Sequence, residues 1–596
     1  MESEIKKIVG TSNRVLEVDL SSAQVREFQV TDHERQLYLG AKGLGLKLLF
    51  ERMQPGINPL GENNYLAFMM GVLMGTGAPC SGRFAAATKS PLTGIMLTSS
   101  CGGPFGMAYK TAGYDGLLIT GKSDKPIYLE IDASGVKFQD AAHLWGLDTM
   151  ETQKALAGDR KSGVLAIGPA GENRVRYANI ASGHRFLGRG GMGAVMGAKN
   201  LKAIVAHGGT YRILPSQAEK FKAVCKKATR YIQNNKYTGD LYRNYGTNAN
   251  TRPCNEAGLI PINNFRRGSD ARAEDVSGQT MQAKYNTSFD TCKPCNILCG
   301  HKGTYPDGSE QHIPEYESVH LLGPNLGIFD TDQITAFNDI CGRMGLDTIS
   351  AGALSSIAHR RDQGDEFAHG TRWLSQKYGG QEFAINVKGL EMAAYDPRGS
   401  WGQGLAYAVA NRGACHLSAY FIALEIYFKY LNPYKTHAKA EFTRLFEDAF
   451  CGINSLQTCE FTAYAYTGES PLTRYSPNPV LAVMMQYLPK VTTKLVDFSI
   501  YADLFEAVSG IPMSTAGFLA AGERIHVLER HMNCREGISR KDDTLPDRFL
   551  KEHREEDLHK RTVPLGKMLD KYYKLRGYDT NGIPTVDTLK RLGIEI

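Results

Sequence analysis

The chain has 596 residues, of which 42% are hydrophobic and 22% are charged. This composition is typical of folded globular proteins and argues against a disordered, collagen-like or coiled-coil chain, and the length predicts two to four domains. The net charge of +7 is spread without a basic tract, so we expect no nucleic-acid binding, although a modestly positive surface can receive an acidic protein partner.

The first 210 residues show the alternating pattern of short strands separated by turns. Residues 14–20 and 25–30 alternate apolar and polar side chains across a short turn, as do residues 127–131 and 136–138. Each pair predicts a β-hairpin. Residues 201–206 form a short apolar run that ends in two glycines, which is typical of a buried strand. This part of the chain is therefore predicted to be rich in β-sheet.

From residue 217 the periodicity becomes helical. Residues 218–234 place Phe221, Val224, Cys225 and Ala228 on one face, and helical patterns dominate after them. The sequence therefore predicts an α+β fold. The charged run 541–556 is interpreted as a solvated surface.

The N-terminus is polar and lacks the apolar core of a secretory signal, so we expect a cytoplasmic protein. The most apolar stretch, residues 65–73, is too short to span a bilayer. The twelve cysteines are irregularly placed apart from Cys292, Cys295 and Cys299, and in such a chain this clustering favours metal binding over disulfides.

Cys292, Cys295 and Cys299 form a C-x2-C-x3-C motif, which places three thiolates within one tight loop. Three soft ligands at this spacing need a fourth from elsewhere in the chain. The spacing favours an iron–sulfur cluster; a structural zinc site is the main alternative, and three unligated cysteines are a third.

Residues 188–193 read Gly-Arg-Gly-Gly-Met-Gly, which formally matches a dinucleotide-binding loop. The chain soon enters the predicted strand at 201, and no Asp or Glu occurs between Gly193 and Glu219 to hold a ribose, so a Rossmann fold is not supported. The bare backbone N–H groups beside Arg189 instead predict a phosphate cradle, with an ordinary glycine turn as the alternative.

Three further small-residue loops occupy residues 75–84, 90–94 and 99–103, and the first of them contains Arg83. Such loops predict that a large flat ligand lies against backbone. A scaffold of strands and turns explains the same composition equally well.

Taken together, these motifs resemble one known family. The segments concerned are residues 81–84, 89–94, 112–116, 188–204, the C-x2-C-x3-C loop, 345–350, 535–537 and 540–546. In content and order, from end to end, they resemble the tungsten-containing aldehyde ferredoxin oxidoreductase family. The resemblance implies a tungsten bis-pterin cofactor of the molybdopterin type, a nearby 4Fe-4S cluster and Mg²⁺ bridging the pterin phosphates.

The same resemblance implies a domain plan. An N-terminal β-sheet base domain (1–210) would bind the pterins, a helical domain (211–415) would contain the cysteine loop, and a C-terminal helical domain (416–596) would contribute the fourth cluster cysteine. The helical domains would enclose the buried cofactor on the base.

Site residues are implied position by position. The cluster ligands would be Cys292, Cys295, Cys299 and Cys459. The pterin and phosphate contacts would be Arg83, Ser100, Gly102, Arg189, Gly190, Gly191, Gly193, Leu346, Asp347, Arg412 and Asn454. Glu317 and His416 match the active-site carboxylate and histidine, and in these roles the carboxylate can take a proton from water while the imidazole donates to a carbonyl oxygen.

The chain departs from the family at both pterin motifs, which usually read D-x-x-G-L-D or D-x-x-G-L-C. The first begins here with Gly342, and the second reads Asn454-Ser455-Leu456-Gln457-Thr458-Cys459. Asn454 can still hydrogen-bond a pterin ring, whereas Gly342 has no side chain to do so. We expect one pterin to be held more by backbone or water.

The implied activity is oxidation of an aldehyde with water to a carboxylic acid, with acid reduction as the available reverse. Electrons would leave through the cluster to ferredoxin or a ferredoxin-like subunit, and an oligomer or hetero-complex is expected. One alternative is an aromatic acyl-CoA reductase of the same family, in which a cysteine reaches the metal, so Cys101, Cys341 and Cys415 are candidates. Another is an electron-transfer or structural subunit that has lost the pterin site.

Overall fold

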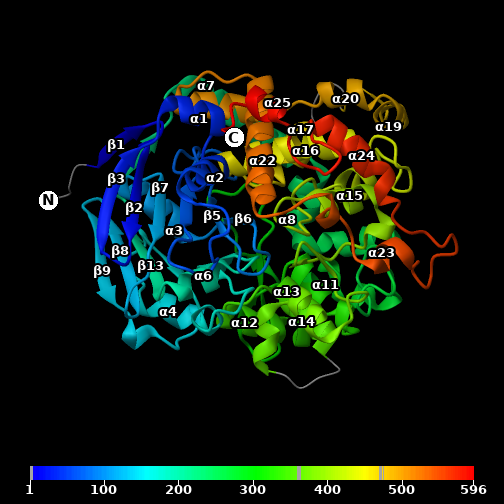
Figure 1. Cartoon of the computed structure of the whole chain (residues 1–596), viewed down its shortest axis with the longest axis horizontal. Helices are drawn as coiled ribbons and strands as arrows, with labels where there is room; N and C mark the ends of the chain where they lie inside the picture. The colour runs from blue at the N-terminus through cyan, green and yellow to red at the C-terminus, as the bar shows by residue number, and fades with distance from the viewer. Residues whose placement is uncertain (1–4, 359–363, 469–472, 474–475, 596) are drawn as a thin grey trace.

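The computed structural model describes residues 5–358, 364–468, 473 and 476–595. Two six-stranded sheets form from the first third of the chain, and helices dominate from α7 (Ala218–Asn234) onward (Figure 1). The predicted α+β fold is confirmed. The predicted helix at residues 218–234 has the bounds of α7, with Val224 and Ala228 buried on its inner face. The domain boundaries stay a prediction.

The first sheet has the strand order β3-β2-β7-β4-β5-β6. Its strands are β2 (Arg14–Asp19), β3 (Gln24–Gln29), β4 (Leu66–Met70), β5 (Phe84–Lys89), β6 (Met96–Cys101) and β7 (Gly116–Thr120). β2 and β3 form the predicted hairpin. β5 and β6 pair antiparallel with Phe84 opposite Cys101, so Arg83 and Gly102, which flank these residues, reach the same edge of the sheet.

The second sheet has the order β12-β11-β10-β13-β8-β9. Its strands are β8 (Ile127–Asp132), β9 (Gly135–Asp140), β10 (Ser162–Ala166), β11 (Ile180–Ser182), β12 (Arg185–Leu187) and β13 (Leu201–His207). β8 and β9 form the second predicted hairpin, and β13 is the predicted buried strand. Helix α3 (Pro104–Ala112) packs against β10 and β13 and shares one apolar core with both sheets.

Helices from distant parts of the sequence cover the first sheet. α2 (Ala41–Arg52) packs on β4 and β5, and it also contacts α16 (Lys439–Leu456) and α22 (Thr515–Arg535). α16 contacts α15 (Trp401–Val409) and α24 (Leu565–Arg576). The largest apolar core therefore joins N-terminal and C-terminal residues, and this packing holds the end of α16 close to the edge of β5 and β6.

A small three-stranded sheet presents the cysteine loop. Its strands are β15 (Ser288–Phe289), β16 (His301–Thr304) and β17 (Glu310–His312). The C-x2-C-x3-C motif is the connection between β15 and β16. Next to this sheet in sequence lie α11 (Tyr316–Leu322), α12 (Thr331–Met344) and α13 (Thr348–Ala358). Within the described residues, no helix is long and apolar enough to cross a membrane.

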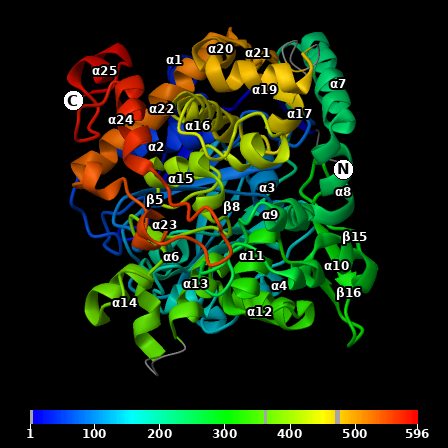
Figure 2. The ribbon, with the colours of Figure 1, turned by 90° about the vertical axis from the view of Figure 1, so that its right-hand side faces the viewer.

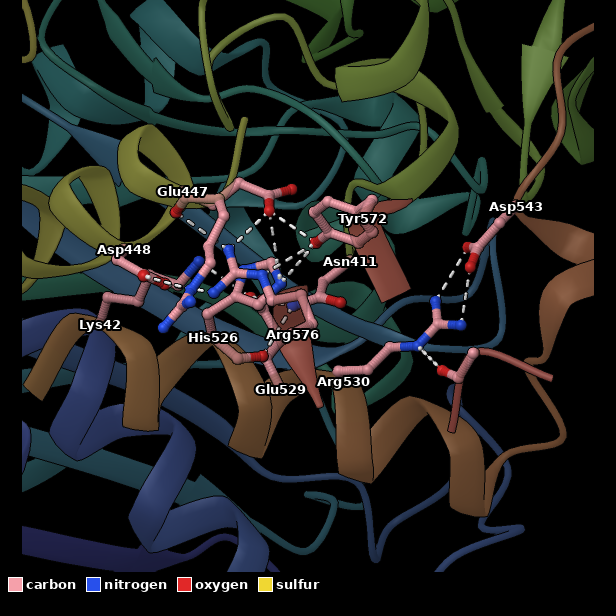
Figure 3. A network of polar contacts seen from close by, with 12 residues as sticks. Lys42, Asn411, Glu447, Asp448, His526, Glu529, Arg530, Asp543, Tyr572 and Arg576 are labelled. Atoms are coloured by element: carbon pink, nitrogen blue, oxygen red, sulfur yellow. Dashed lines mark hydrogen bonds and ion pairs between the residues drawn. The ribbon is translucent and has the colours of Figure 1, made fainter. Parts of the chain in front are cut away.

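The interpretation of residues 541–556 as a solvated surface is wrong for part of the run. Asp543 is buried and forms an ion pair with Arg530 at 2.7 Å (Figure 3). It also pairs with Lys388 at 2.8 Å. Arg548 and Arg554 are also buried. Composition alone did not show that these charges have partners in distant segments.

A buried charge network joins α24 to α16. Arg576 contacts Glu447 at 2.7 Å and also pairs with Asp448, and the Tyr572 hydroxyl donates to Glu447 at 2.6 Å (Figure 3). Arg576 and Glu447 are both fully shielded from solvent. Burial raises the pKa of Glu447 to about 7 despite the opposing charge of Arg576.

We expect Arg576→Met to destabilise the protein by about 3–5 kcal/mol, because it leaves buried Glu447 without its cation and Asp448 with only Arg444 at 3.8 Å. The check is the shift of the urea unfolding midpoint followed by tryptophan fluorescence. Lys574→Met on the exposed side of the same helix is the control and should shift the midpoint little. Equal midpoints for the two variants would show that the network adds no stability.

Candidate active site

Three cavities meet at Arg83, which lines all of them. The cysteine cavity, of about 240 Å³, is lined by the four predicted cluster cysteines. The α16 cavity, of about 300 Å³, lies against the end of α16 and is lined by Arg412 and Asn454. The α12 cavity, of about 580 Å³, lies against the end of α12 and is lined by Leu346 and Asp347. The two predicted pterin motifs thus line different cavities on either side of one arginine.

The cysteine cavity gathers residues from two distant segments. Cys292, Cys295 and Cys299 come from the loop before β16, and Cys459 follows the end of α16. Two glycines allow the loop to approach the first sheet. A Cβ at Gly82 would collide with the carbonyl oxygen of Lys293, and a Cβ at Gly102 would lie 2.7 Å from the Sγ of Cys292.

A fifth cysteine, Cys80, also lines this cavity, and the sequence analysis missed it. The backbone N–H of Asn296 donates to its Sγ at 3.5 Å, and its carbonyl accepts from the N–H of Cys459 at 3.0 Å. The Cys80 thiol also hydrogen-bonds to Cys295, which lowers the pKa of Cys295 and raises that of Cys80. Cys80 lies outside the four cysteines that match the family's ligands, so we treat it as a neighbour of the predicted site.

The positions of the cysteine side chains help to distinguish a single zinc ion from an iron–sulfur cluster. Within the described parts of the chain, no three Cys, His, Asp or Glu side chains are grouped so that they could hold a single metal ion. A zinc ion would draw its sulfurs to about 2.3 Å from one point. A cavity ringed by the four cysteines fits a larger group of metal and sulfide atoms.

The α16 cavity has a charged inner end. Lys42 from α2 pairs with Glu529 from α22 at 2.9 Å, and Glu447 and His526 line the same end (Figure 3). Nearer Arg83, the Asn454 amide donates to the Oε1 of Glu460 at 2.6 Å. Asn454 stands where the motif usually has an acid, and Glu460 places a carboxylate beside it. The sequence analysis missed Glu460, although it directly follows Cys459.

The α12 cavity is built around the turn between two helices. Gly345 ends α12 with a φ of 80°, and Asp347 follows it and accepts the N–H of Ile349 at 3.1 Å in the first turn of α13. Gly342 lines the cavity without a side chain, as expected, while Asp339 lines it from one turn earlier in α12. This motif, too, has a nearby carboxylate at another position.

Arg189 connects the glycine loop to three other segments. Its guanidinium is 3.4 Å from Asp347, donates to the Ala414 carbonyl at 2.9 Å and also contacts the Glu391 carbonyl. Gly188 has open space where a Cβ would lie and lines two of the cavities.

The later glycines of this loop lie away from the cavities. Gly190, Gly191 and Gly193 line none of the three cavities. A Cβ at Gly191 or Gly193 would collide with the backbone of residues 176–179. These glycines are explained by the close approach of two chain segments, and their role as a phosphate cradle stays a prediction.

Glu317 and His416 lie together in the cysteine cavity. The Oε1 of Glu317, from the first turn of α11, is 3.3 Å from the Nε2 of His416, and its Oε2 accepts the N–H of Ala394 at 2.7 Å. Burial raises the pKa of Glu317 to about 7. Burial, together with Arg189 and Arg412, lowers the pKa of His416 well below its ordinary value. The pair thus combines a neutral imidazole with a carboxyl group that can exchange a proton near neutral pH.

The pH dependence of turnover should follow this carboxyl group. A base acts only when it is deprotonated, so kcat/KM should fall about tenfold per pH unit below pH 7 and level off above it. Because burial raises the Glu317 pKa, this limb should lie well above the ordinary range of a glutamate. The measurement is kcat/KM from pH 5.5 to 9. A limb that persists unchanged in Glu317→Gln would assign it to another group.

Comparison with known proteins decides the family. The sequence model of the aldehyde ferredoxin oxidoreductase N-terminal domain matches residues 15–208, and the model of domains 2 and 3 matches residues 223–356 and 353–594. The chain belongs to the aldehyde ferredoxin oxidoreductase family. The resemblance inferred from the motifs is therefore confirmed, and the chain is a member of a family of oxidoreductase enzymes.

Relatives in this family match over nearly the full chain. The tungsten-containing aldehyde ferredoxin oxidoreductases of Pyrococcus furiosus and Thermococcus kodakarensis are each 36% identical, over 98% of this chain and 99% of the relative. Among solved structures, the active-site complex BamBC of benzoyl coenzyme A reductase superposes with a TM-score of 0.80 at 24% identity, covering 98% and 97% of the two chains. That likeness supports the fold of this family member.

Proposed function

We propose that this aldehyde ferredoxin oxidoreductase family member is a tungsten-pterin enzyme that oxidises aldehydes with water to carboxylic acids. The observation that carries the proposal is the meeting of three cavities at Arg83. One contains the Glu317–His416 pair with the four cysteines, and the other two extend from Arg83 along α16 and α12. The 36% identity to tungsten-containing relatives supports the choice of metal.

The residues present fit the proposed cofactors. Buried polar atoms without a hydrogen-bond partner in the described structure line the cavities, among them the Oδ1 atoms of Asn179 and Asn411 and the Nδ1 of His416. Such atoms need partners that a polar heterocycle would supply. Arg412 and Asn454 would hold one pterin, and Leu346 and Asp347 the other. Arg83, Arg189, Ser100 and Gly102 would serve phosphates and pterin edges, with Mg²⁺ between the phosphates.

The chemistry divides between the cofactors and the chain. The tungsten-pterin group would supply the two-electron acceptor for the substrate, and Cys292, Cys295, Cys299 and Cys459 would hold a 4Fe-4S cluster that would pass electrons on singly. Glu317 takes a proton from the attacking water, and its raised pKa matches this task at neutral pH. His416 donates a hydrogen bond to the carbonyl oxygen from its neutral ring and so holds the substrate beside Glu317.

Electrons leave this chain, in our proposal, to a ferredoxin or a ferredoxin-like subunit. The proposal rests on the single predicted cluster and on the absence of a convincing nicotinamide fingerprint in the sequence. The same reaction run in reverse, reduction of an acid by a low-potential donor, is available to the same site.

The test of the function is aldehyde-dependent reduction of a viologen dye by anaerobically purified protein, over a panel of aldehydes and acyl thioesters. We expect turnover with aldehydes and formation of the matching acid. Turnover with aromatic acyl thioesters but with no aldehyde would contradict the proposal.

Cys415 favours a second candidate, an aromatic acyl-CoA reductase in which a cysteine reaches the metal. Cys415 is next to His416, lines the α16 cavity and accepts from Arg412 at 2.9 Å. Cys101 lines the α12 cavity, whereas Cys341 lines none of the three. X-ray absorption at the tungsten edge distinguishes the candidates, because a cysteine ligand adds a fifth sulfur to the four dithiolene sulfurs.

A further inference from the structure

The cysteine loop comes close to the protein surface beside α8 (Tyr242–Tyr245). One ring nitrogen of His301 lies 3.1 Å from the carbonyl oxygen of Cys299, and the other lies 3.0 Å from the carbonyl oxygen of Arg243. His301 is buried, whereas Arg243 is exposed. A single buried imidazole therefore links a predicted cluster ligand to a surface helix.

An apolar side chain is exposed at the surface next to His301. Phe289 in β15 is 51% exposed. Its ring centroid is 5.5 Å from that of His301, and the guanidinium of Arg243 lies 5.4 Å from it. Lys293, within the cysteine loop, is also exposed. An exposed aromatic ring stacked with an arginine is typical of the anchors of protein interfaces, in which aromatic and arginine side chains are enriched.

Positive charge continues from this point along α7. The η2 segment (Lys236–Leu241) packs against both α7 and α8, and α7, α8 and β15 follow one another along one side of the molecule (Figure 2). The exposed basic residues of this side without an ion pair among the described residues are Lys222, Lys226, Arg230, Lys236, Arg243 and Lys293.

Acids offset part of this charge: Glu219 in α7 and Asp240 in η2 are exposed, and Asp290 is partly exposed beside His312 at 2.6 Å. The six basic residues named above outnumber these acids. Lys302, in contrast, is paired with Glu310 and adds little to the positive field. We name the surface formed by α7, α8, Phe289 and Lys293 the basic side. It is positive and includes the exposed ring of Phe289, whose strand β15 directly precedes the cysteine loop.

We propose that the basic side is the docking surface for an acidic electron-carrier protein, with Phe289 and Arg243 at its centre. The inference rests on the proposed function, because it takes the four cysteines to hold the cluster through which electrons leave. Complementary charge steers such a carrier to this side and raises its association rate at low salt. Contact at Phe289 and Arg243 then brings its redox centre next to His301 and Cys299.

The inward side of the loop is closed to a protein. The backbone carbonyl of Lys293 and the Sγ of Cys292 approach Gly82 and Gly102 there, and buried Cys80 contacts Asn296, whereas the Lys293 side chain is exposed. The basic side offers a partner an approach to the cysteine loop from outside.

The experiment measures association of the metal-loaded enzyme with a small acidic 4Fe-4S ferredoxin by biolayer interferometry, at low ionic strength and in about 0.5 M salt. We expect Arg243→Glu to slow association about tenfold at low ionic strength, with most of the difference lost at high salt. Phe289→Ala should speed dissociation several-fold without changing the salt dependence. Iron content and aldehyde-dependent viologen reduction should be unchanged in both variants.

The control is Lys567→Glu, which makes the same change of charge at an exposed position in α24, on the opposite side of the molecule (Figure 2). It should leave association unchanged. The proposal is overturned if Arg243→Glu and Phe289→Ala both bind like the wild type, or if Lys567→Glu slows association as much as Arg243→Glu. Binding needs no aldehyde, and viologen reduction needs no carrier, so a failure of docking and a failure of the proposed reaction are separate results.

Discussion

Replacing Glu317 by glutamine should lower turnover per tungsten atom by about 10²- to 10⁴-fold while tungsten and iron contents stay at wild-type levels. The substitution keeps the size of the side chain and an oxygen that can accept the N–H of Ala394, which Glu317 binds at 2.7 Å. It removes only the carboxylate that can take a proton. Turnover per metal atom is the informative quantity because it separates lost chemistry from lost cofactor.

A second active-site variant and a control variant test the same assignment. His416→Asn should lower turnover by a comparable factor, although Arg412 nearby means that cofactor loading must be measured with it. Glu274→Gln, at an exposed carboxylate paired with Arg252, should leave turnover unchanged. Near-normal turnover in Glu317→Gln would show that another group activates water, and the assignment of Glu317 as the base would be withdrawn.

Replacing Cys459 by alanine should remove most of the iron and the low-potential electron-spin signals while much of the tungsten remains. The reason is that three thiolates from one loop leave a four-iron cluster with an unprotected corner, whereas the pterins have other contacts in the α16 and α12 cavities. Iron per chain and electron paramagnetic resonance of the dithionite-reduced protein are the measurements.

Cys80 provides the matched control, because it lines the same cavity and contacts the same loop. It lies outside the four cysteines that match the family's cluster ligands. Cys80→Ala should therefore retain iron and change only the reduction potential. Loss of iron in Cys80→Ala together with normal iron in Cys459→Ala would show that the fourth ligand was misassigned.

The sequence predicts those helices and strands that depend on the order of neighbouring side chains. The hairpins, the strand at 201 and helix α7 follow from side-chain periodicity, which sets the face that each element buries. The C-x2-C-x3-C spacing indicates a metal loop in the same local way, since three of the predicted ligands come from one short segment, and this site stays a prediction.

The rest of the site depends on contacts between distant segments, which periodicity does not encode. Lys42 and Glu529 meet because α2 packs on α22, and no motif links them. Glu460 places its carboxylate beside Asn454, whereas the family motif has its acid at the position of Asn454 itself. Asp543 belongs to a charged run that looks solvated in the sequence, yet its partners Arg530 and Lys388 come from other segments.

We propose that this chain holds both a tungsten-pterin cofactor and an iron–sulfur cluster, and metal and pterin analysis of anaerobically purified protein shows whether both are present. We predict about one tungsten, about two pterins and about four iron atoms per chain, with little zinc. Iron without tungsten, molybdenum or pterin would contradict the account and indicate an electron-transfer subunit, and zinc in place of iron would contradict the assignment of the four cysteines.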